Sequence, residues 1–155
     1  MAKNYDYYQV SGISISPDNK KMAFGVDTLS RRIYTIKVKD LTNGRMYPDK
    51  IDGVNSSTTW ASDSQTMFYT GKDRQTLRSN KIFRHSLGES QDDDILVYEE
   101  KDETFSTFVY PSKSREYIMI GSSSTMATEY RFLLSKTPLE PFKIIQKRER
   151  GLEYS

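Results

Sequence analysis

The sequence contains no cysteine among its 155 residues. This absence excludes disulfides and thiolate-based metal sites, and it favours a reducing compartment. The chain also lacks a strong charge imbalance, because 23 basic residues stand against 21 acidic ones and the formal net charge is +2. Nucleic acids and anionic membranes are bound by surfaces with a clear excess of positive charge. We therefore expect neither kind of partner.

Long hydrophobic runs are missing as well. The first ten residues, MAKNYDYYQV, contain no apolar stretch of the kind found in signal peptides, and no later run reaches membrane-spanning length. The chain is nevertheless 35% hydrophobic and 12% aromatic, which is enough to bury a core. These features predict a soluble, cytoplasmic protein.

The most prominent feature that is present is a repeated phrase. The segment SISPDNKKMAFG (14–25) resembles TWASDSQTMFYT (59–70) and VYPSKSREYIMIG (109–121). The first two copies align at an offset of 45, and the second and third align at an offset of 50, which places Asp63 on Lys113. Each copy has the pattern of a strand, a polar turn and a second, apolar strand.

Two further strand-like segments follow each copy, so the sequence has four short strands in each repeat. A period of roughly 45 residues with four strands is typical of a β-propeller blade. A single four-stranded sheet cannot bury both of its faces, whereas stacked blades can. The sequence therefore predicts an all-β fold, a partial β-propeller of about three four-stranded antiparallel blades.

The repeat also predicts how the chain is divided. We expect residues 1–155 to be one propeller fragment and a piece of a larger protein. Its expected parts are a leader strand (1–11), three blades (12–52, 53–103 and 104–149) and the start of another blade (150–155).

Strand patterning predicts which side chains are buried. The second strand of each repeat is apolar on both sides, as expected for a strand that lies between neighbouring blades. We therefore expect Phe68, Tyr69, Ile118 and Ile120 to be buried. The alternating segment 32–41 predicts a strand with one apolar face and one lysine-bearing face.

The sequence offers poor candidates for a catalytic centre. A hydrolase nucleophile elbow requires Gly-x-Ser-x-Gly, but GSSST (121–125) has Thr125 where the second glycine is needed. The only histidine, His85, precedes these serines, whereas the α/β-hydrolase order is serine, acid, histidine. We interpret GSSST as a polar loop, and His85, on one strand face with Phe83 and Leu87, as a packed structural residue. No catalytic residue is predicted.

Metal and cofactor sites are not predicted either. The acidic run ESQDDD (89–94) lacks the spacing and the glycine of an EF-hand loop, so we interpret it as a solvated turn before a strand. Trp60 falls at an innermost-strand position and is interpreted as a packing residue.

Longer phrases of the sequence resemble one peptidase family. They are DT…RR.YT…..DL..G, TLR…..RH.LG and VYEEKD..F, in this order along residues 6–155. This combination resembles the oligopeptidase B branch of the prolyl oligopeptidase family of serine peptidases. The resemblance implies a seven-bladed propeller joined to an α/β-hydrolase domain with a Ser-Asp-His triad and with carboxylates that select Arg or Lys. The propeller would admit peptides and exclude folded proteins, and all catalytic residues would lie outside this segment.

One loop stands out as a candidate contact site. In a propeller, the loops between second and third strands lie on one face, together with the connections between blades. The expected loops are 28–32, 72–80 and 123–129. The middle loop is the longest and carries Lys72, Asp73, Arg74 and Arg78. It is either a solvated loop or a surface that contacts the hydrolase domain or the passing peptide.

The function expected from these observations is that of a gating and size-selecting segment in a serine oligopeptidase that cleaves short peptides after basic residues. The expected partners are the hydrolase domain of the same chain and peptide substrates. We expect this chain alone to be inactive, and to self-associate because its terminal blade faces are open. The alternative is a non-enzymatic, TolB-like propeller that serves as a protein-interaction scaffold. The two differ in whether a hydrolase domain follows Ser155.

Overall fold

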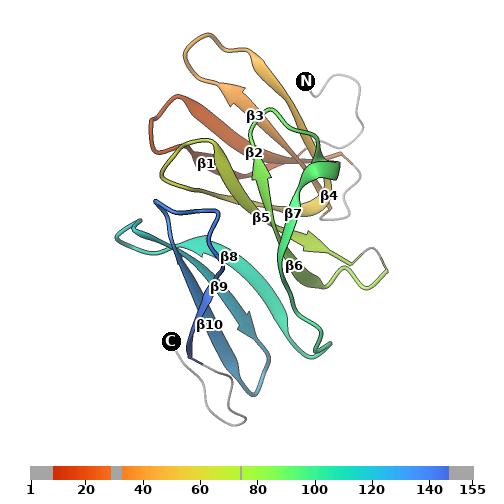
Figure 1. The fold of residues 1–155 in the computed structure, drawn as a ribbon. Helices are drawn as coiled ribbons and strands as arrows, with labels where there is room; N and C mark the ends of the chain where they lie inside the picture. Colours follow the sequence, from red (N-terminus) through yellow and green to blue (C-terminus); the bar gives the residue numbers. More distant parts are fainter. Residues whose placement is uncertain (1–8, 29–32, 74, 147–155) are drawn as a thin grey trace.

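The computed structural model describes residues 9–28, 33–73 and 75–146, and these consist mainly of β-strands (Figure 1). The strands are β1 (Gln9–Ile15), β2 (Lys21–Asp27), β3 (Tyr34–Asp40), β4 (Met46–Trp60), β5 (Thr66–Lys72), β6 (Ser79–Ser86), β7 (Ile95–Glu99), β8 (Ser106–Pro111), β9 (Tyr117–Ser123), β10 (Thr128–Leu134) and β11 (Lys143–Gln146). One short 3-10 turn, η2 (Gln91–Asp93), precedes β7. No helix within the described ranges is long and apolar enough to cross a membrane.

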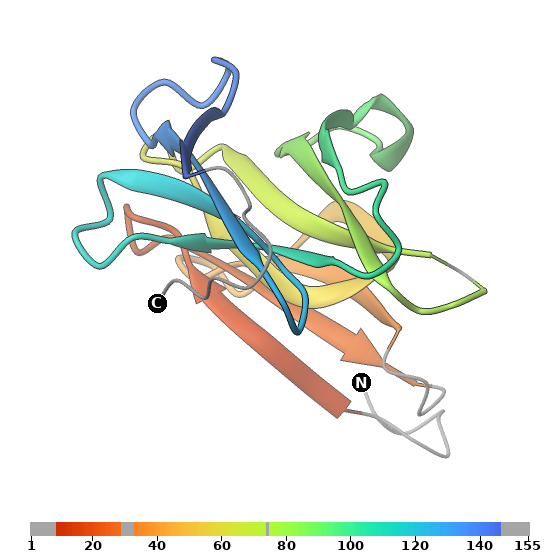
Figure 2. The same cartoon turned by 90° about the horizontal axis from the view of Figure 1, so that it is seen from below.

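The strands form two antiparallel sheets. The larger sheet has 7 strands in the order β1 to β7, and the smaller sheet has 4 strands in the order β11-β10-β9-β8. Within each sheet, every strand therefore pairs with its neighbours in sequence, as in a meander. Strand β8 lies beside β4, β5 and β6, so the smaller sheet packs against the second half of the larger one (Figures 1 and 2). The arrangement confirms the predicted all-β, antiparallel, partial propeller.

Strand β4 belongs to two groups of four strands at once. Its first half pairs with β3 through Ile51 opposite Ile36, and its second half pairs with β5 through Thr59 opposite Phe68. Val54 pairs on both sides, and the register shifts immediately after it. The first group is therefore β1, β2, β3 and the first half of β4, and the second is the second half of β4 with β5, β6 and β7. The third group, β8 to β11, is a separate sheet.

The three repeated turns share one backbone geometry. In each, one non-glycine residue adopts a positive φ: 61° at Asn19, 56° at Ser64 and 62° at Arg115. The amide of each of these residues donates to the carbonyl three residues earlier, at 2.9 to 3.1 Å.

This geometry confirms the predicted alignment of the first two copies and corrects that of the third. Asp63 corresponds to Ser114, one residue beyond the predicted Lys113. Asp63 and Ser114 are equivalent because each side chain accepts the backbone amide two residues later in its turn. The Ser114 hydroxyl accepts the amide of Glu116, just as the Asp63 carboxylate accepts that of Gln65.

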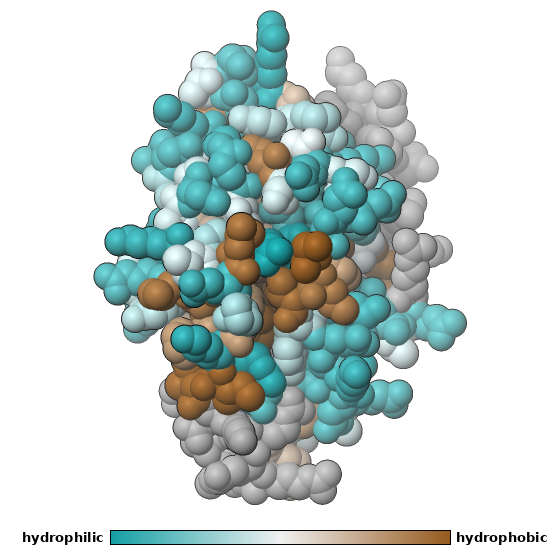
Figure 3. Space-filling model, viewed as in Figure 1, coloured by the Kyte–Doolittle hydropathy of each residue, from teal (hydrophilic) through white to brown (hydrophobic). Residues whose placement is uncertain are grey.

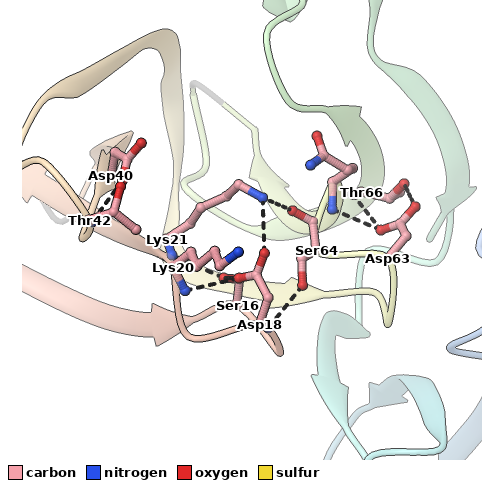
Figure 4. Close-up of polar contacts among 10 residues, drawn as sticks. Ser16, Asp18, Lys20, Lys21, Asp40, Thr42, Asp63, Ser64 and Thr66 are labelled. Carbon is pink, nitrogen blue, oxygen red and sulfur yellow. Dashed lines mark hydrogen bonds and ion pairs between the residues drawn. The ribbon is translucent and has the colours of Figure 1, made fainter.

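A polar cluster joins the first turn to the second (Figure 4). Lys21 is buried, and its ammonium donates to the carbonyl of Ser64 at 2.8 Å and lies 3.4 Å from the Asp18 carboxylate. The Asp18 amide in turn donates to the Ser64 hydroxyl at 3.1 Å. Hydrogen bonds from Ser16 and from the Lys20 amide lower the pKa of Asp18. The cluster therefore fixes the first group of strands to the second at their turn ends.

The core runs through the second strands of the groups. Phe68, Tyr69, Ile118 and Ile120 are all buried, which confirms the prediction made from their two-sided apolar pattern. The largest cluster spans both sheets, because Phe68 from β5 packs with Ile118 and Ile120 from β9. Trp60 packs with Met67 and other apolar residues, as predicted, and its indole nitrogen also donates to the carbonyl of Ser14 at 3.1 Å.

Apolar side chains also remain on the surface. One view shows two such patches, one over the middle of the molecule and one in its lower part (Figure 3). The exposed apolar residues of the edge strands and of the β10–β11 region are Val10, Ile13, Ile15, Leu134, Leu139, Ile144 and Ile145. The second sheet thus ends on a surface with the composition of a blade contact.

Candidate functional site on the loop face

The loop between β5 and β6 is folded by Asp73. Its carboxylate accepts the amides of Gln75 and Thr76 at 2.9 and 3.0 Å, and its own amide donates to the carbonyl of Arg78 at 2.8 Å. The backbone hydrogen bonds from Thr76 and Gln75 lower the pKa of Asp73. This is the side-chain-to-backbone geometry that favours aspartate in turns. Asp73 therefore shapes the loop itself.

Arg78 binds the chain segment that connects β7 to β8. Its Nε donates to the carbonyl of Phe105 at 2.8 Å. Its Nη2 donates to the carbonyls of Glu100 and Asp102 at 2.6 and 2.9 Å. One guanidinium thus holds three main-chain oxygens of residues 100–105, a segment we call the 100–105 connection. Arg78 is half-buried in this position.

The four residues predicted on this loop therefore differ in their roles. Asp73 and Arg78 are engaged in the fold as described above. Lys72 is half-buried at the end of β5, where it pairs in register with Ser79. Arg74 lies outside the described residues. Whether the loop contacts a hydrolase domain or a peptide stays a prediction.

A groove opens next to the Arg78 contacts. It lies between the 100–105 connection and the loop that joins β9 to β10, and it has a volume of about 540 Å3. The residues that line it are Asp102, Thr104, Phe105, Ser124, Thr125, Met126 and Ala127. Asp102 and Phe105 are also two of the residues whose carbonyls Arg78 holds. The loops 73–78 and 124–127 and the 100–105 connection are thus brought together on one face, which we call the loop face. Residues 29–32 of the first expected loop are outside the described ranges.

Both apolar and polar residues line this groove. The Ser124 hydroxyl accepts the amides of Met126 and Ala127, both at 3.1 Å, and so holds the β9–β10 loop in a tight turn. This leaves the Met126 side chain 58% exposed at the rim, while Phe105 is buried in the wall. Such a surface offers both apolar contact and hydrogen-bonding backbone groups.

His85 lies elsewhere, in a buried chain of charged groups. Its Nε2 is 2.6 Å from the Asp49 carboxylate, and its Nδ1 is 2.6 Å from that of Asp94. The Tyr69 hydroxyl donates to the second oxygen of Asp94 at 2.5 Å, and the Gly88 amide donates to Asp49 at 2.8 Å. Because β4 supplies Asp49 and β6 supplies His85, the chain of contacts fixes the first group of strands to the second.

The protonation states of His85 and Tyr69 in this network follow from their surroundings. Burial acts to lower the pKa of His85, but the hydrogen bonds to Asp49 and Asp94 and their charges outweigh it and raise the pKa to about 9. Burial, together with the hydrogen bond to Asp94, raises the pKa of the Tyr69 hydroxyl. At neutral pH His85 is therefore a cation between two carboxylates. Both ring nitrogens are engaged, as expected of a structural histidine.

The acidic run 89–94 is not wholly the solvated turn that we expected. Asp94 is buried against His85 and Tyr69, and only 2% of its side chain is exposed. Gln91 exchanges hydrogen bonds with the backbone of Asp52, with its amide NH2 donating to the carbonyl and its oxygen accepting the backbone amide, both at 3.0 Å. The correction arises because the sheet brings β4 beside this turn, which supplies partners from outside the run.

The serine cluster also departs from its predicted place. Gly121, Ser122 and Ser123 are the end of β9, and only the following residues form a loop. Ser122 is buried, with its hydroxyl 3.1 Å from that of Thr107 and 3.3 Å from that of Tyr98. Thr107 pairs with Ser122 across the sheet, so a polar pair extends the strand where the sequence indicated a loop.

Comparison with known proteins gives a consistent result. The family model for the prolyl oligopeptidase N-terminal β-propeller domain matches residues 1–155. Dipeptidyl aminopeptidase BI of Pseudoxanthomonas mexicana is 37% identical over 149 residues, which are 96% of this chain and 20% of that protein. Protease 2 of Moraxella lacunata is 31% identical over 156 residues, which cover 99% of this chain and 22% of that protein.

Solved structures agree with these sequence matches. Oligopeptidase B from Leishmania major superposes with a TM-score of 0.94 at 31% identity, over 99% of this chain and 22% of that one. Oligopeptidase B from Trypanosoma brucei, with covalently bound antipain in a closed form, superposes with a TM-score of 0.88 at 26% identity, over 99% of this chain and 21% of that one. The chain thus spans about a fifth of the length of the relatives that it matches.

Proposed function

The chain belongs to the prolyl oligopeptidase family, as part of its N-terminal β-propeller domain, and on this premise we propose that it is the gating segment of a serine oligopeptidase. In this proposal its blades stand in front of a hydrolase domain of the same longer protein. They admit short peptides and keep folded proteins from the catalytic centre. The observation that carries the proposal is the match of all 155 residues to a peptidase propeller.

The proposed cleavage after basic residues rests on the resemblance to oligopeptidase B. The sequence phrases that suggested this branch are supported by the TM-score of 0.94 with one oligopeptidase B. In the family pattern, the groups that select Arg or Lys belong to the hydrolase domain. This chain would therefore contribute to which peptides arrive, and the hydrolase domain to which bond is cut.

The loop face is the proposed contact surface. It gathers the 100–105 connection, the 73–78 loop and the 124–127 loop around one groove. Loops positioned by a rigid sheet are common sites of contact in proteins. A peptidase parent is favoured over a non-enzymatic scaffold, because the family and the relatives described above are peptidases.

The first test separates this chain from the longer protein. We expect the purified 155-residue chain to leave peptides with basic residues intact and to resist a fluorophosphonate probe. The longer protein should cleave the same peptides and be labelled. Stoichiometric labelling of Ser122, Ser123 or Ser124 in the short chain would contradict the assignment of catalysis to another domain.

The second test concerns size selection by the longer protein. A series of peptides with one identical cleavage site and increasing flanking length should show a falling kcat/KM. The same site in an exposed loop of a stably folded protein should not be cut. Equal cleavage of the shortest peptide and of the folded protein would rule out a gating role.

A further inference from the structure

The two sheets meet along a seam that has no strand pairing. The pairings of the described chain divide it into β1 to β7 and β8 to β11, and no ladder joins β7 to β8. By contrast, the first and second groups of strands share β4. A shared strand therefore resists separation of the first two groups, whereas side chains, a single backbone hydrogen bond from Ser62 to Ser135 and the 100–105 connection hold the third in place.

Contacts along the seam differ from one end to the other. At the turn end, the Ser62 amide donates to the carbonyl of Ser135 at 3.1 Å, and their hydroxyls are 3.0 Å apart. In the middle, Phe68 packs edge-on against Phe142 and into the cluster with Ile118 and Ile120. Apolar packing of this kind is strong, but it sets no fixed direction. At the loop-face end, the polar contacts of Arg78 with the connection lie beside the groove.

Arginine has the geometry that this end of the seam requires. The guanidinium is a planar fork of donors, and Arg78 directs it at the carbonyls of Glu100, Asp102 and Phe105. These carbonyls come from both ends of the short connection, so one side chain fixes its curvature. The Asp102 and Phe105 positions are at the same time the wall of the groove. A lysine ammonium has no planar fork and cannot reproduce this pattern.

We propose that Arg78 is a positioning residue that holds the loop-face end of the seam closed and sets the shape of the adjacent groove. This inference rests on the proposed gating function, because closure of the seam then limits the size of peptide that passes the propeller. Loss of the fork releases the part of the connection from Asp102 to Phe105, while the Glu100 amide still donates to the carbonyl of Asn80 at 2.7 Å. The third group of strands can then move away from the second on the loop face, while the apolar cluster and Ser62–Ser135 still hold the other parts.

The test uses two substitutions of Arg78 and one control. Arg78→Met removes the charge and the fork, whereas Arg78→Lys keeps the charge and removes only the fork. The control is Arg84→Met, at a half-buried arginine on β6, the strand that follows Arg78, where it lines a hollow with Tyr98, Arg131 and Phe142 rather than with the 100–105 connection. Should Arg78→Met fail to fold, Arg78→Lys decides the question.

The first measurement is hydrogen exchange of this chain. Hydrogen bonds from a charged group stabilise a structure enough that their loss should speed exchange of the Asp102 and Phe105 amides, which are bonded within the connection, by about tenfold or more. Both Arg78 variants should show this change, and Arg84→Met should not. Wild-type protection in Arg78→Lys would overturn the inference, because charge alone would then suffice. Equal loss of protection in Arg84→Met would overturn it as well.

The second measurement is the length dependence of cleavage by the longer protein. Both Arg78 variants should raise kcat/KM for long peptides relative to kcat/KM for the shortest one. An unaltered length profile in an active Arg78→Lys enzyme would overturn the inference. If the wild-type longer protein cleaves no peptide at all, the proposed function fails, and hydrogen exchange still decides whether Arg78 positions the connection.

Discussion

At the residue scale, His85 brings a positive charge into the interior between Asp49 and Asp94. All three side chains are almost completely shielded from water. A buried ion pair contributes little net stability compared with a well-packed apolar core, but the loss of one partner leaves the others as uncompensated charges. The stability of the contact between β4 and β6 therefore depends strongly on the single side chain of His85.

Replacement of this histidine should show that sensitivity. We expect His85→Gln to lower the free energy of unfolding by about 3–5 kcal/mol, because two buried carboxylates lose their cation. Urea unfolding at pH 7 measures this. Lys37→Ala, on the half-exposed face of β3, serves as the control and should change the free energy by less than about 0.5 kcal/mol. Similar values for both variants would contradict the role given to His85.

The same residue predicts how stability changes with pH. The pKa of His85 is raised from 6.5 to about 9 in the folded protein. Its stabilising contribution is therefore complete below pH 6.5 and is lost as the pH rises through about 9.

Comparison of wild type with His85→Gln isolates this contribution, because other titrating groups are common to both proteins. The difference in their free energies of unfolding should be largest at pH 6 and should shrink by pH 10. A difference that stays constant over this range would show that the charge on His85 has no part in stability.

The sequence could reveal only one side of this network. Alternation on one strand predicted that His85 packs inward with Phe83 and Leu87. Its two partners come from the first half of β4 and from the residue just before β7. Asp49 and Asp94 lie in segments whose charge is typical of exposed strands and turns, so nothing local marks them as buried. Their burial depends on which strands become neighbours.

At the scale of elements, close packing of β1 against the middle of β4 depends on Gly12. This residue has φ 67°, and a Cβ added to it would lie 2.2 Å from the carbonyl oxygen of Ser56. Gly44, in the turn between β3 and β4, also has a positive φ, 75°, but nothing lies within 4 Å of an added Cβ. Both glycines have a positive φ, but only Gly12 has no room for a side chain.

That difference gives a matched pair of substitutions. Gly44→Ala should cost about 1–2 kcal/mol, the strain of a left-handed residue with a side chain. Gly12→Ala should cost clearly more, because β1 must also move away from β4. Urea melts of both variants compare the two costs. Equal destabilisation would mean that β1 can shift without loss, and would contradict the close contact with Ser56.

The core strands supply a second element-level prediction. Phe68→Ala should lower the free energy of unfolding by about 3–5 kcal/mol, since it empties space in the cluster shared by both sheets. Met126→Ala, at the exposed rim of the groove, should change it by less than about 0.5 kcal/mol. Thermal and urea unfolding provide the comparison. A comparable loss at Met126 would place that residue in a core rather than at a rim.

The strands and turns were largely predictable, because their signals are local. Alternation of apolar and polar residues and turn-forming residues identified the repeating four-strand pattern. The continuity of β4 was not predictable in this way. Its polar stretch NSSTT (55–59) has the composition of a break between strands. It stays extended because β5 offers it a ladder, through Thr58 opposite Tyr69 and Thr59 opposite Phe68.

At the scale of the whole molecule, the first and last strands of the described structure are sheet edges that expose apolar side chains. β1 is an edge of the larger sheet and exposes Val10, Ile13 and Ile15, and β11 is an edge of the smaller sheet and exposes Ile144 and Ile145. Burial of apolar surface contributes about 25 cal/mol per Å2, so covering a blade face is strongly favourable. Exposed edges also offer unpaired backbone groups to other chains.

We therefore predict that the 155-residue chain self-associates in solution. Size exclusion coupled to light scattering should show dimers or larger species whose fraction rises with protein concentration. Ile13→Lys and Ile144→Lys place charges on the two surfaces and should shift the distribution towards the monomer. A monodisperse wild-type monomer at high concentration would show that the exposed edges do not drive association, and would contradict this prediction.

Shared strand β4 also decides where this family can be recombined. A chimaera with its crossover near Gly53 would take the two halves of one strand from different parents, and both ladders would then depend on a foreign register. A crossover within residues 100–105 cuts no strand. Arg78 contacts only main-chain oxygens there, and every amino acid supplies such an oxygen. Relatives could therefore exchange the first two groups of strands as one module, with the crossover within residues 100–105.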